Sequence, residues 1–246
     1  DFTWKDFQER NNSELVSIFG NYVNRTFVLM HKLCAGKVPP LHHDSIDDAD
    51  KAMIASIQNS TFKIQNFLDS FKFRDALFEV IDLARKGNKY LQEKEPWKKA
   101  TSHKPQATSN TIEGLQLTAN SQQLEIDNCI HICVQLTANL AIFINPFLPF
   151  TAKKMLHMMK VVDKMLDWEN AGKMNLLKVG YSLRAPELLF RKIEDEEILL
   201  IPGLNLFEQG EFKNINGNNF QSSLFAYKDH IYLNSDRFIE EGEEIF

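Results

Sequence analysis

The sequence of 246 residues is poor in glycine and proline: it has 10 and 8 of them, a combined share well below the usual value of roughly 12%. This scarcity excludes a turn-rich all-β protein and a disordered linker, and it favours long helices. Only three cysteines occur, Cys34, Cys129 and Cys133, too few for a disulfide framework or a four-ligand zinc site. We therefore expect reduced, mostly buried thiols.

Long apolar runs are also missing. The longest, residues 140–150, is interrupted by Asn145, Pro146 and Pro149 and falls short of the roughly 20 apolar residues that a membrane helix needs. Residues 1–6 are charged and aromatic, so they lack the basic start and apolar stretch of a secretory signal. We expect an intracellular, cytoplasmic protein with no membrane partner.

Motifs for catalysis are absent as well. The sequence has no glycine-rich phosphate loop, no G-x-S-x-G turn around a nucleophilic serine and no H-E-x-x-H metal motif. Cys129 and Cys133 lie one helical turn apart, but no further ligand accompanies them, and core packing is the better interpretation. His157 lies among methionines, which is typical of an apolar helix face. The sequence therefore predicts no catalytic residue, no metal site and no cofactor in this chain.

Charge is unevenly distributed along the chain. The formal net charge is −5, and residues 199–246, with 3 basic and 8 acidic side chains, account for all of it. Residues 85–104 instead carry seven basic side chains and two acidic ones, and Tyr90 and Trp97 lie among them. Basic groups interleaved with aromatic rings bind phosphates and stack on unpaired bases, but a solvated helix end has the same composition. Both interpretations stay open at this point.

Helical periodicity dominates residues 1–198. Apolar side chains recur at intervals of three or four residues, which predicts helices over residues 6–37, 47–71, 74–94, 125–145 and 151–167. The fourth has room to begin near residue 111, after a loop predicted over residues 101–110. Pro96 is expected to end the third helix, because the residue before a proline avoids the helical conformation. The fold class is therefore mostly α.

After Ile198 the helical periodicity ends and the sequence carries turn and strand signals. Asn216-Gly217 is a hairpin signal, and residues 224–227 and 231–233 are compatible with strands. We therefore divide the chain into a helical domain, residues 1–198, and a small β-rich, acidic C-terminal appendage, residues 199–246. The sequence gives no role for the appendage.

One pair of polar residues is notable on the first predicted helix. Asn21 and Arg25 lie one turn apart and face away from the apolar stripe. Arg25 has no carboxylate three or four residues away in either direction, so its guanidinium is not bound locally. An amide and an unpaired guanidinium can bind the hydrogen-bonding edge of an unstacked base, although an isolated surface arginine usually does nothing specific.

Several segments carry a resemblance to a known family. They are DFTWKDF (1–7), NSELV (12–16), GNYVNR (20–25), NKYLQEKEPW (88–97), QLTANLA (135–141), PFLPFTA (146–152), WENAG (168–172) and PELLFRKIE (186–194). Over residues 1–198 the chain resembles the anticodon-binding helical domain of methionyl-tRNA synthetases, which are class I aminoacyl-tRNA ligases. The resemblance implies an antiparallel helical bundle that recognises the CAU anticodon of the methionine tRNA.

The resemblance also implies a site. In that family a helical asparagine and arginine hydrogen-bond the first anticodon base, a cytosine, and a tryptophan after a proline stacks on it. The matching residues are Asn21, Arg25 and Trp97, with Pro96 aiming the indole. The candidates for support of the site, or for contact with phosphates of the anticodon stem, are Asn88, Lys89, Lys94, Lys98 and Lys99.

The family's catalytic module precedes this domain: a Rossmann-type fold with H-I-G-H-like and K-M-S-K-S-like motifs for ATP and a zinc-bearing insertion. None of these motifs occurs here. We therefore expect a part of a methionine-tRNA ligase that does not activate methionine unaided, with the methionine tRNA and the enzyme's own catalytic domain as partners. ATP, Mg and zinc are implied only for that missing domain. The alternative is a helical bundle that docks a protein partner or dimerises.

Overall fold

A computed structural model describes residues 3–101, 112–199, 223–227 and 230–234. The chain divides into two compact units: residues 10–191 form one, and residues 1–9 together with 192–246 form the other. Most of the loop predicted over 101–110 and the predicted turn at Asn216-Gly217 lie outside the described residues.

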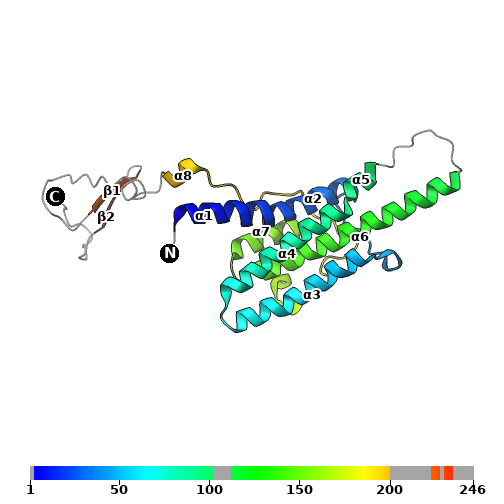
Figure 1. Cartoon of the computed structure of the whole chain (residues 1–246), viewed down its shortest axis with the longest axis horizontal. Helices are drawn as coiled ribbons and strands as arrows, with labels where there is room; N and C mark the ends of the chain where they lie inside the picture. The colour runs from blue at the N-terminus through cyan, green and yellow to red at the C-terminus, as the bar shows by residue number, and fades with distance from the viewer. Residues whose placement is uncertain (1–2, 102–111, 200–222, 228–229, 235–246) are drawn as a thin grey trace. The chain divides into compact units, whose positions relative to one another are not determined.

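The larger unit is a bundle of helices, as Figure 1 shows. Its helices are η1 (Asn11–Gly20), α2 (Asn21–Leu33), α3 (Asp48–Asp69), α4 (Phe73–Lys94), α5 (Pro96–Thr101), α6 (Ile112–Ile144) and α7 (Pro149–Met159), with short turns η2 (His43–Ser45), η3 (Asp163–Leu166) and η4 (Trp168–Asn170). This confirms the predicted helical bundle. The predicted span of α3 differs from the observed one by one residue at its start and two at its end, and that of α4 differs by one residue at its start and ends at the same residue, Lys94.

Helix α6 lies at the centre of the bundle. Every side chain from residue 128 to residue 144 is buried. The stretch Ser121–Ile144 is long and apolar enough to cross a membrane by length and composition, yet 94% of that window is buried by the rest of the chain. A largely apolar helix that is covered on all sides is the core helix of a bundle.

The buried polar side chains of α6 hold the segments that cross the bundle. Asn128 pairs with the backbone of His42: its Oδ1 accepts the N–H at 2.6 Å and its Nδ2 donates to the carbonyl at 3.0 Å. Gln135 pairs in the same way with the backbone of Leu177, at 3.1 and 2.7 Å. Polar groups inside a core are tolerated when each has a partner, and here the partners are backbone groups of irregular segments.

The helix predicted over residues 6–37 is interrupted. Its central part, η1, is a wide helix in which the backbone N–H of Asn21 reaches back to the carbonyl of Val16, five residues earlier, as well as to Ile18. The hydroxyl of Ser17 likewise donates to the carbonyl of Asn12 at 2.7 Å. Such wide segments are rare and occur often at functional sites. The apolar periodicity does not reveal this one, because it persists through η1.

The last predicted helix, over residues 151–167, is wrong in its second half. Helix α7 ends at Met159 because Lys160 adopts a left-handed conformation with a φ of 56°. The N–H of Lys160 bonds to the carbonyl of His157, which closes the final turn. Glycine usually marks such an end, and a lysine gives no signal in the sequence.

The smaller unit contains parts of both ends of the chain. In it Gln8, in α1 (Trp4–Arg10), donates to the carbonyl of Ile193 at 3.0 Å and to Asp195 at 2.9 Å, just where α8 (Asp195–Leu199) begins. Strands β1 (Ser223–Tyr227) and β2 (His230–Asn234) pair antiparallel, with Ser223 opposite Asn234 and Tyr227 opposite His230. The division of the chain into a helical domain, residues 1–198, and a β-rich appendage, residues 199–246, stays a prediction.

Candidate nucleic-acid interface

The fold brings Arg25 and Trp97 together. The guanidinium carbon of Arg25, on α2, lies over the indole of Trp97, on α5, at 5.5 Å from the ring centroid. This is a cation–π arrangement, and both side chains are half-buried. Two of the three residues singled out in the sequence therefore meet, although they lie on different helices.

Asn88 on α4 holds Arg25 from the side. Its Oδ1 accepts a hydrogen bond from Nη1 of Arg25 at 3.3 Å. Its Nδ2 donates to the carbonyl of Ile18 in η1 at 2.9 Å and to that of Ala84 at 3.3 Å. One amide thus connects α4, the wide helix η1 and the Arg25 guanidinium, which restricts where that guanidinium can lie.

Gly87 belongs to the packing around this candidate site and was not identified from the sequence. A Cβ at position 87 would lie 2.5 Å from Cε2 of Tyr22 and 2.8 Å from Cδ2 of Leu136, so no other residue fits without displacing them. Glycine inside a helix costs about 1 kcal/mol relative to alanine, and here it allows α4 to approach α2 closely enough for Asn88 to reach Arg25. The available signal was a glycine within a helical pattern, directly before Asn88.

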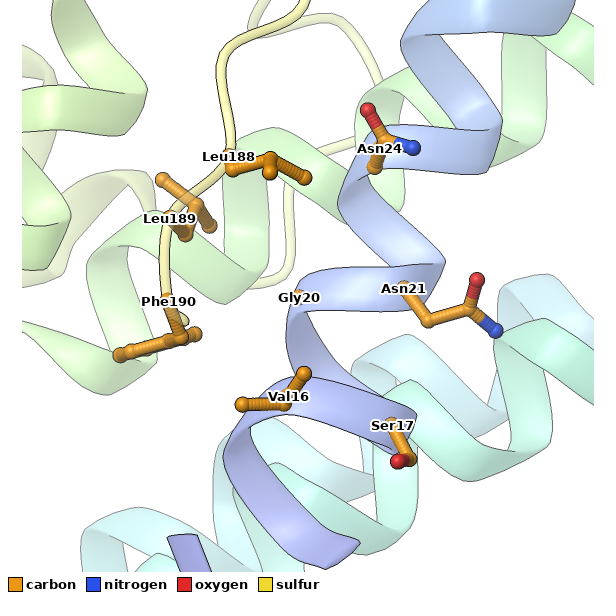
Figure 2. Close-up of a pocket in the computed structure, with 8 residues that line it drawn as sticks. All are labelled: Val16, Ser17, Gly20, Asn21, Asn24, Leu188, Leu189 and Phe190. Carbon is orange, nitrogen blue, oxygen red and sulfur yellow. The ribbon is translucent and has the colours of Figure 1, made fainter. Parts of the chain in front are cut away.

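Asn21 is exposed and borders a pocket of about 360 Å³. The residues that line it are Val16, Ser17, Gly20, Asn21, Asn24, Leu188, Leu189 and Phe190. In Figure 2, Asn21 and Asn24 project from successive turns of α2, and Leu188 extends toward the helix from the 188–190 segment. Within the described part of the chain neither side-chain amide has a hydrogen-bond partner, so the pocket has an open polar edge and an apolar wall.

Gly20 marks the closest approach of that segment to the helix. A Cβ there would lie 3.2 Å from Cδ2 of Phe190 and 3.0 Å from the carbonyl oxygen of Leu15. The pocket therefore depends on the absence of a side chain at position 20.

In the folded chain, carboxylates neutralise most of the positive charge of residues 85–104. The excess of basic over acidic side chains counted in the sequence therefore overstates the charge that is available. Each basic side chain of this stretch that the structure describes has a carboxylate within 4.0 Å. The pairs are Arg85–Asp82, Lys86–Asp82, Lys89–Glu93, Lys94–Asp47, Lys94–Asp50, Lys98–Glu95 and Lys99–Glu125. Several of the carboxylates come from outside the stretch, so a local charge count overestimates the excess.

Lys94 is the clearest case. Its side chain is only 5% exposed, and its ammonium lies 2.7 Å from Asp47 and 2.8 Å from Asp50. Burial alone would lower the pKa of Lys94, but the hydrogen bonds and charges of the two carboxylates raise it above its ordinary value. Lys94 is therefore a charged group held by two carboxylates inside the protein. This geometry suits support of the site better than contact with phosphates, and both roles stay predictions.

Arg25 differs from all of these basic residues. Among the residues that the structure describes, no carboxylate lies within ion-pair distance of its guanidinium. Its partners are an amide oxygen and an aromatic ring. The side chains of Lys89 and Lys98 are 77% and 67% exposed, and each lies near a carboxylate on its own helix or turn, Glu93 and Glu95 respectively. Their contact with phosphates stays a prediction.

Two of the three cysteines, Cys34 and Cys133, have raised thiol pKa values. Burial raises the pKa of Cys34 to about 12, with the nearby charge of Asp127 as a lesser cause. Burial also raises the pKa of Cys133 well above its ordinary value. In the described residues no three His, Cys, Asp or Glu side chains gather into a group that could hold a metal ion.

Comparison with known proteins gives a consistent result. A family model described as the anticodon binding domain of methionyl tRNA ligase matches residues 42–199, which include Asn88 and Trp97. The chain is 42% identical over 198 residues to a methionine-tRNA ligase of Phocaeicola vulgatus and 41% identical to one of Bacteroides fragilis. Each alignment covers 80% of this chain but only 26% of the relative, so the chain spans about a quarter of the length of these relatives.

A solved structure gives the same fold. Mycobacterium tuberculosis methionyl-tRNA synthetase in complex with methionyl-adenylate matches with a TM-score of 0.65 over 77% of this chain and 33% of that one. The sequence identity is 20%, so this likeness establishes the helical architecture alone.

Proposed function

The chain belongs to the anticodon-binding domain family of methionyl-tRNA ligase, and from this premise we propose that it binds the anticodon stem-loop of the methionine tRNA. In this proposal it reads the first anticodon base, a cytosine, with Asn21, Arg25 and Trp97. Asn88 supports the site by holding Arg25.

The observation that carries the proposal is the state of Arg25. Its guanidinium is half-buried, lies over Trp97, is held by one bond to Asn88 and has no carboxylate partner within the described residues. Only one of its five N–H donors is used in that bond, so the others are available to an acceptor. A fixed, uncompensated cation beside an aromatic face is the arrangement that binds an unstacked base.

The chemistry of the base explains the preference for cytosine. Its pairing edge presents two acceptors, O2 and N3, and one donor, the N4 amino group. Arginine donors match the acceptors, and the amide oxygen of Asn21 accepts from N4. Uracil presents an N–H at position 3, which opposes the donors of Arg25. Base edges of unstacked nucleotides are read in this way in single-stranded RNA.

The pocket beside Asn21 extends the proposed surface. Its three polar side chains, Ser17, Asn21 and Asn24, face an apolar wall formed by residues 188–190. We infer that it receives the nucleotide next to the one bound at Trp97. Asn24→Ala would then weaken RNA binding without relaxing the preference at the first base.

At the level of the whole enzyme, we infer that the chain acts in the cytoplasm as part of a methionine-tRNA ligase that attaches methionine to its tRNA with ATP. The names of the relatives and the chain's span of 26% of their length support this inference. The catalytic domain of that enzyme would be the second partner, and ATP, Mg and zinc would bind there. We propose that this chain alone does not activate methionine.

The test is a titration with two anticodon stem-loops, one carrying CAU and one carrying UAU, at a stated low salt concentration. The proposal expects a clear preference for CAU. Trp97→Ala should weaken binding by about 1–3 kcal/mol, because the stacked base loses its platform. Arg74→Ala is a matched control, since Arg74 is an exposed arginine on the same helix as Asn88. Equal binding of both RNAs by the unaltered chain would contradict the proposal.

The alternative, docking of a protein partner, is favoured by one observation. Four phenylalanines on α3, α4 and the turn between them are exposed: Phe62, Phe71, Phe73 and Phe78, at 70%, 80%, 55% and 62%. Apolar patches of this kind mark interaction surfaces, and the catalytic domain is the occupant that we propose. A Phe62→Ser/Phe71→Ser variant should lose association with that domain and retain the CAU preference, whereas loss of the preference would place both functions on one surface.

A further inference from the structure

Lys94, the last residue of α4, is held by the start of α3. Its ammonium lies 2.7 Å from Oδ2 of Asp47 and 2.8 Å from Oδ1 of Asp50. Asp47 is also the cap of α3: it accepts the N–H of Asp50 at 2.9 Å, and Asp50 accepts the N–H of Asp47 at 3.2 Å. Both carboxylates are thus fixed by the first turn of a helix, so the end of α4 is tied to a rigid part of the bundle.

Tyr90 adds a second tie one turn earlier on α4. Its hydroxyl donates to Oδ1 of Asp50 at 2.6 Å. Burial raises the pKa of Tyr90, so the hydroxyl stays protonated and keeps donating. Asp50 is fully buried and receives both Tyr90 and Lys94. The last turn of α4 therefore cannot rotate without breaking two buried contacts.

The chain turns sharply directly after Lys94. Glu95 has a φ of 42° and a ψ of 52°, in the left-handed region that residues with a side chain rarely adopt. Pro96 then begins α5, and Trp97 follows it. The carbonyl of Glu95 accepts the N–H of Lys98 at 2.9 Å. A strained residue of this kind persists where its surroundings determine it on both sides, and Lys94 supplies the side toward α4.

We propose that Lys94 is a positioning residue for base recognition. By holding the end of α4 against Asp47 and Asp50, it sets the turn at Glu95 and so places the indole of Trp97 beside the guanidinium of Arg25. Lys94 contacts no RNA and acts through Trp97. Its consequence for RNA binding rests on the proposed function, whereas its effect on the position of Trp97 is measurable without RNA.

The RNA-free measurement uses NMR of the full chain. The side-chain Nε–H signal of Arg25 is shifted by the ring current of the indole above it, and Trp97→Ala defines its position without that ring. Arg25→Lys assigns the signal by removing it. In Lys94→Met, which keeps an unbranched side chain and removes the charge, we expect the signal to move most of the way to its position in Trp97→Ala.

Two further variants keep the test decisive. Lys94→Arg retains the charge and should keep the signal near its original position. If Lys94→Met does not fold, Asp47→Asn removes the more exposed of the two carboxylate partners, 55% exposed, and should produce a smaller shift in the same direction.

The control is Ser60→Ala. The hydroxyl of Ser60 donates to Oε1 of Glu79 at 2.8 Å and links α3 to α4 through a different buried contact. This variant should lower the unfolding midpoint and leave the Arg25 signal unmoved. A folded Lys94→Met protein with an unshifted signal would overturn the proposal, and so would an equal shift in Ser60→Ala.

The RNA measurement separates the two hypotheses. The ratio of dissociation constants for UAU and CAU stem-loops should fall by about 5-fold or more in Lys94→Met, as expected when one specific base contact is displaced. If the unaltered chain shows no preference, the proposed function fails, while the NMR shift still decides whether Lys94 positions Trp97. If the signal moves but the preference survives, the role of Lys94 in recognition is refuted.

Discussion

Helices α6 and α2 both carry an amide side chain four residues from a second polar side chain, but the two pairs differ in what surrounds them. On α6, Gln135 and Asn139 are 0% exposed, and their amides bind backbone groups of the irregular chain between residues 172 and 177. On α2, the amide of Asn21 has no hydrogen-bond partner in the described part of the chain, and Arg25 has no carboxylate there.

This comparison shows that residue type and spacing do not distinguish a structural amide from a binding one. The fold distinguishes them by supplying, or not supplying, partners. Buried polar groups whose donors and acceptors are all paired contribute to a unique core. Polar groups that remain open on a surface, and are held in place by a neighbour such as Asn88, are available to a ligand.

The largest expected effect comes from breaking the α6 pair. In Asn139→Leu, the carbonyl of Lys173 loses a donor at 2.9 Å and the N–H of Gly172 loses an acceptor at 2.6 Å. Two part-buried backbone groups that lose their partners, together with a disturbed core position at residue 139, should reduce the free energy of unfolding by about 2–4 kcal/mol. Urea unfolding measures this loss. The CAU preference, measured well below the unfolding midpoint, should be unchanged, and a relaxed preference would show that α6 is not purely structural.

A substitution in the Asn21–Arg25 pair on α2 should instead reduce the discrimination between RNAs and leave the stability nearly unchanged. Arg25→Ala is expected to reduce the discrimination between CAU and UAU stem-loops by about 1–3 kcal/mol, because the donors matched to cytosine are removed. Its free energy of unfolding should change by less than about 1 kcal/mol, since no ion pair is lost. Calorimetric titration and urea unfolding on the same samples test both parts. A large loss of stability with intact discrimination would show that Arg25 supports the fold and does not read the base.

The pH dependence of stability tests whether Lys94, Asp47 and Asp50 stabilise the fold as charged partners. Burial opposes ionisation of Asp47, but the hydrogen bond and charge of Lys94 outweigh it, so the pKa of Asp47 is lowered, while that of Lys94 is raised. A lowered carboxyl pKa stabilises the fold above the ordinary value of 3.8, and this contribution is lost as the pH falls through the folded-state pKa. A raised lysine pKa stabilises the fold below 10.5, and this contribution is lost as the pH rises through the folded-state pKa.

The measurement for this prediction is the difference in urea midpoint between the unaltered chain and Lys94→Met. We expect it to be constant across neutral pH and to shrink in strong acid and strong alkali. Tyr90 and Asp50 face the same ammonium and are present in both proteins. A difference that grew in acid would contradict the assigned partners.

The smallest effect is expected at Lys98. Its ammonium is 67% exposed and lies 2.8 Å from Glu95, so it acts as a screened surface charge. Lys98→Ala should weaken both stem-loops equally and reduce the slope of log affinity against log salt by about 1 or less. Titrations at several salt concentrations test this. Unequal weakening of the two RNAs would give Lys98 a role in reading the base.

Much of the fold could be predicted because it depends on local pattern. The apolar periodicity predicts α3 and α4 to within one or two residues, and the absence of a nearby carboxylate in the sequence anticipates the unpaired state of Arg25. Two features could not be predicted because they have no local signal in the sequence. The backbone of η1 widens within an unbroken apolar stripe, and α7 ends at a lysine in a left-handed conformation.

The part of the site that could not be predicted is tertiary. The partners of Lys94, Asp47 and Asp50, lie on another helix, so no window of residues around position 94 reveals that its charge is buried. Contact between Arg25 and Trp97 was expected only through the family resemblance. The identity of the bound base rests on that resemblance and on the proposed function.

The close packing at Gly87 has a consequence for redesign. Since only a glycine fits against the ring of Tyr22, α4 cannot slide along its axis by one residue without forcing Lys86 or Asn88 into a space that admits no Cβ. The packing at Gly87 therefore fixes the position of α4 along its axis, and with it the axial positions of Asn88 and Lys94 in the bundle. Substitutions on α2 and α5 that test or alter the proposed anticodon preference can be made against this constant frame, provided that position 87 is left unchanged.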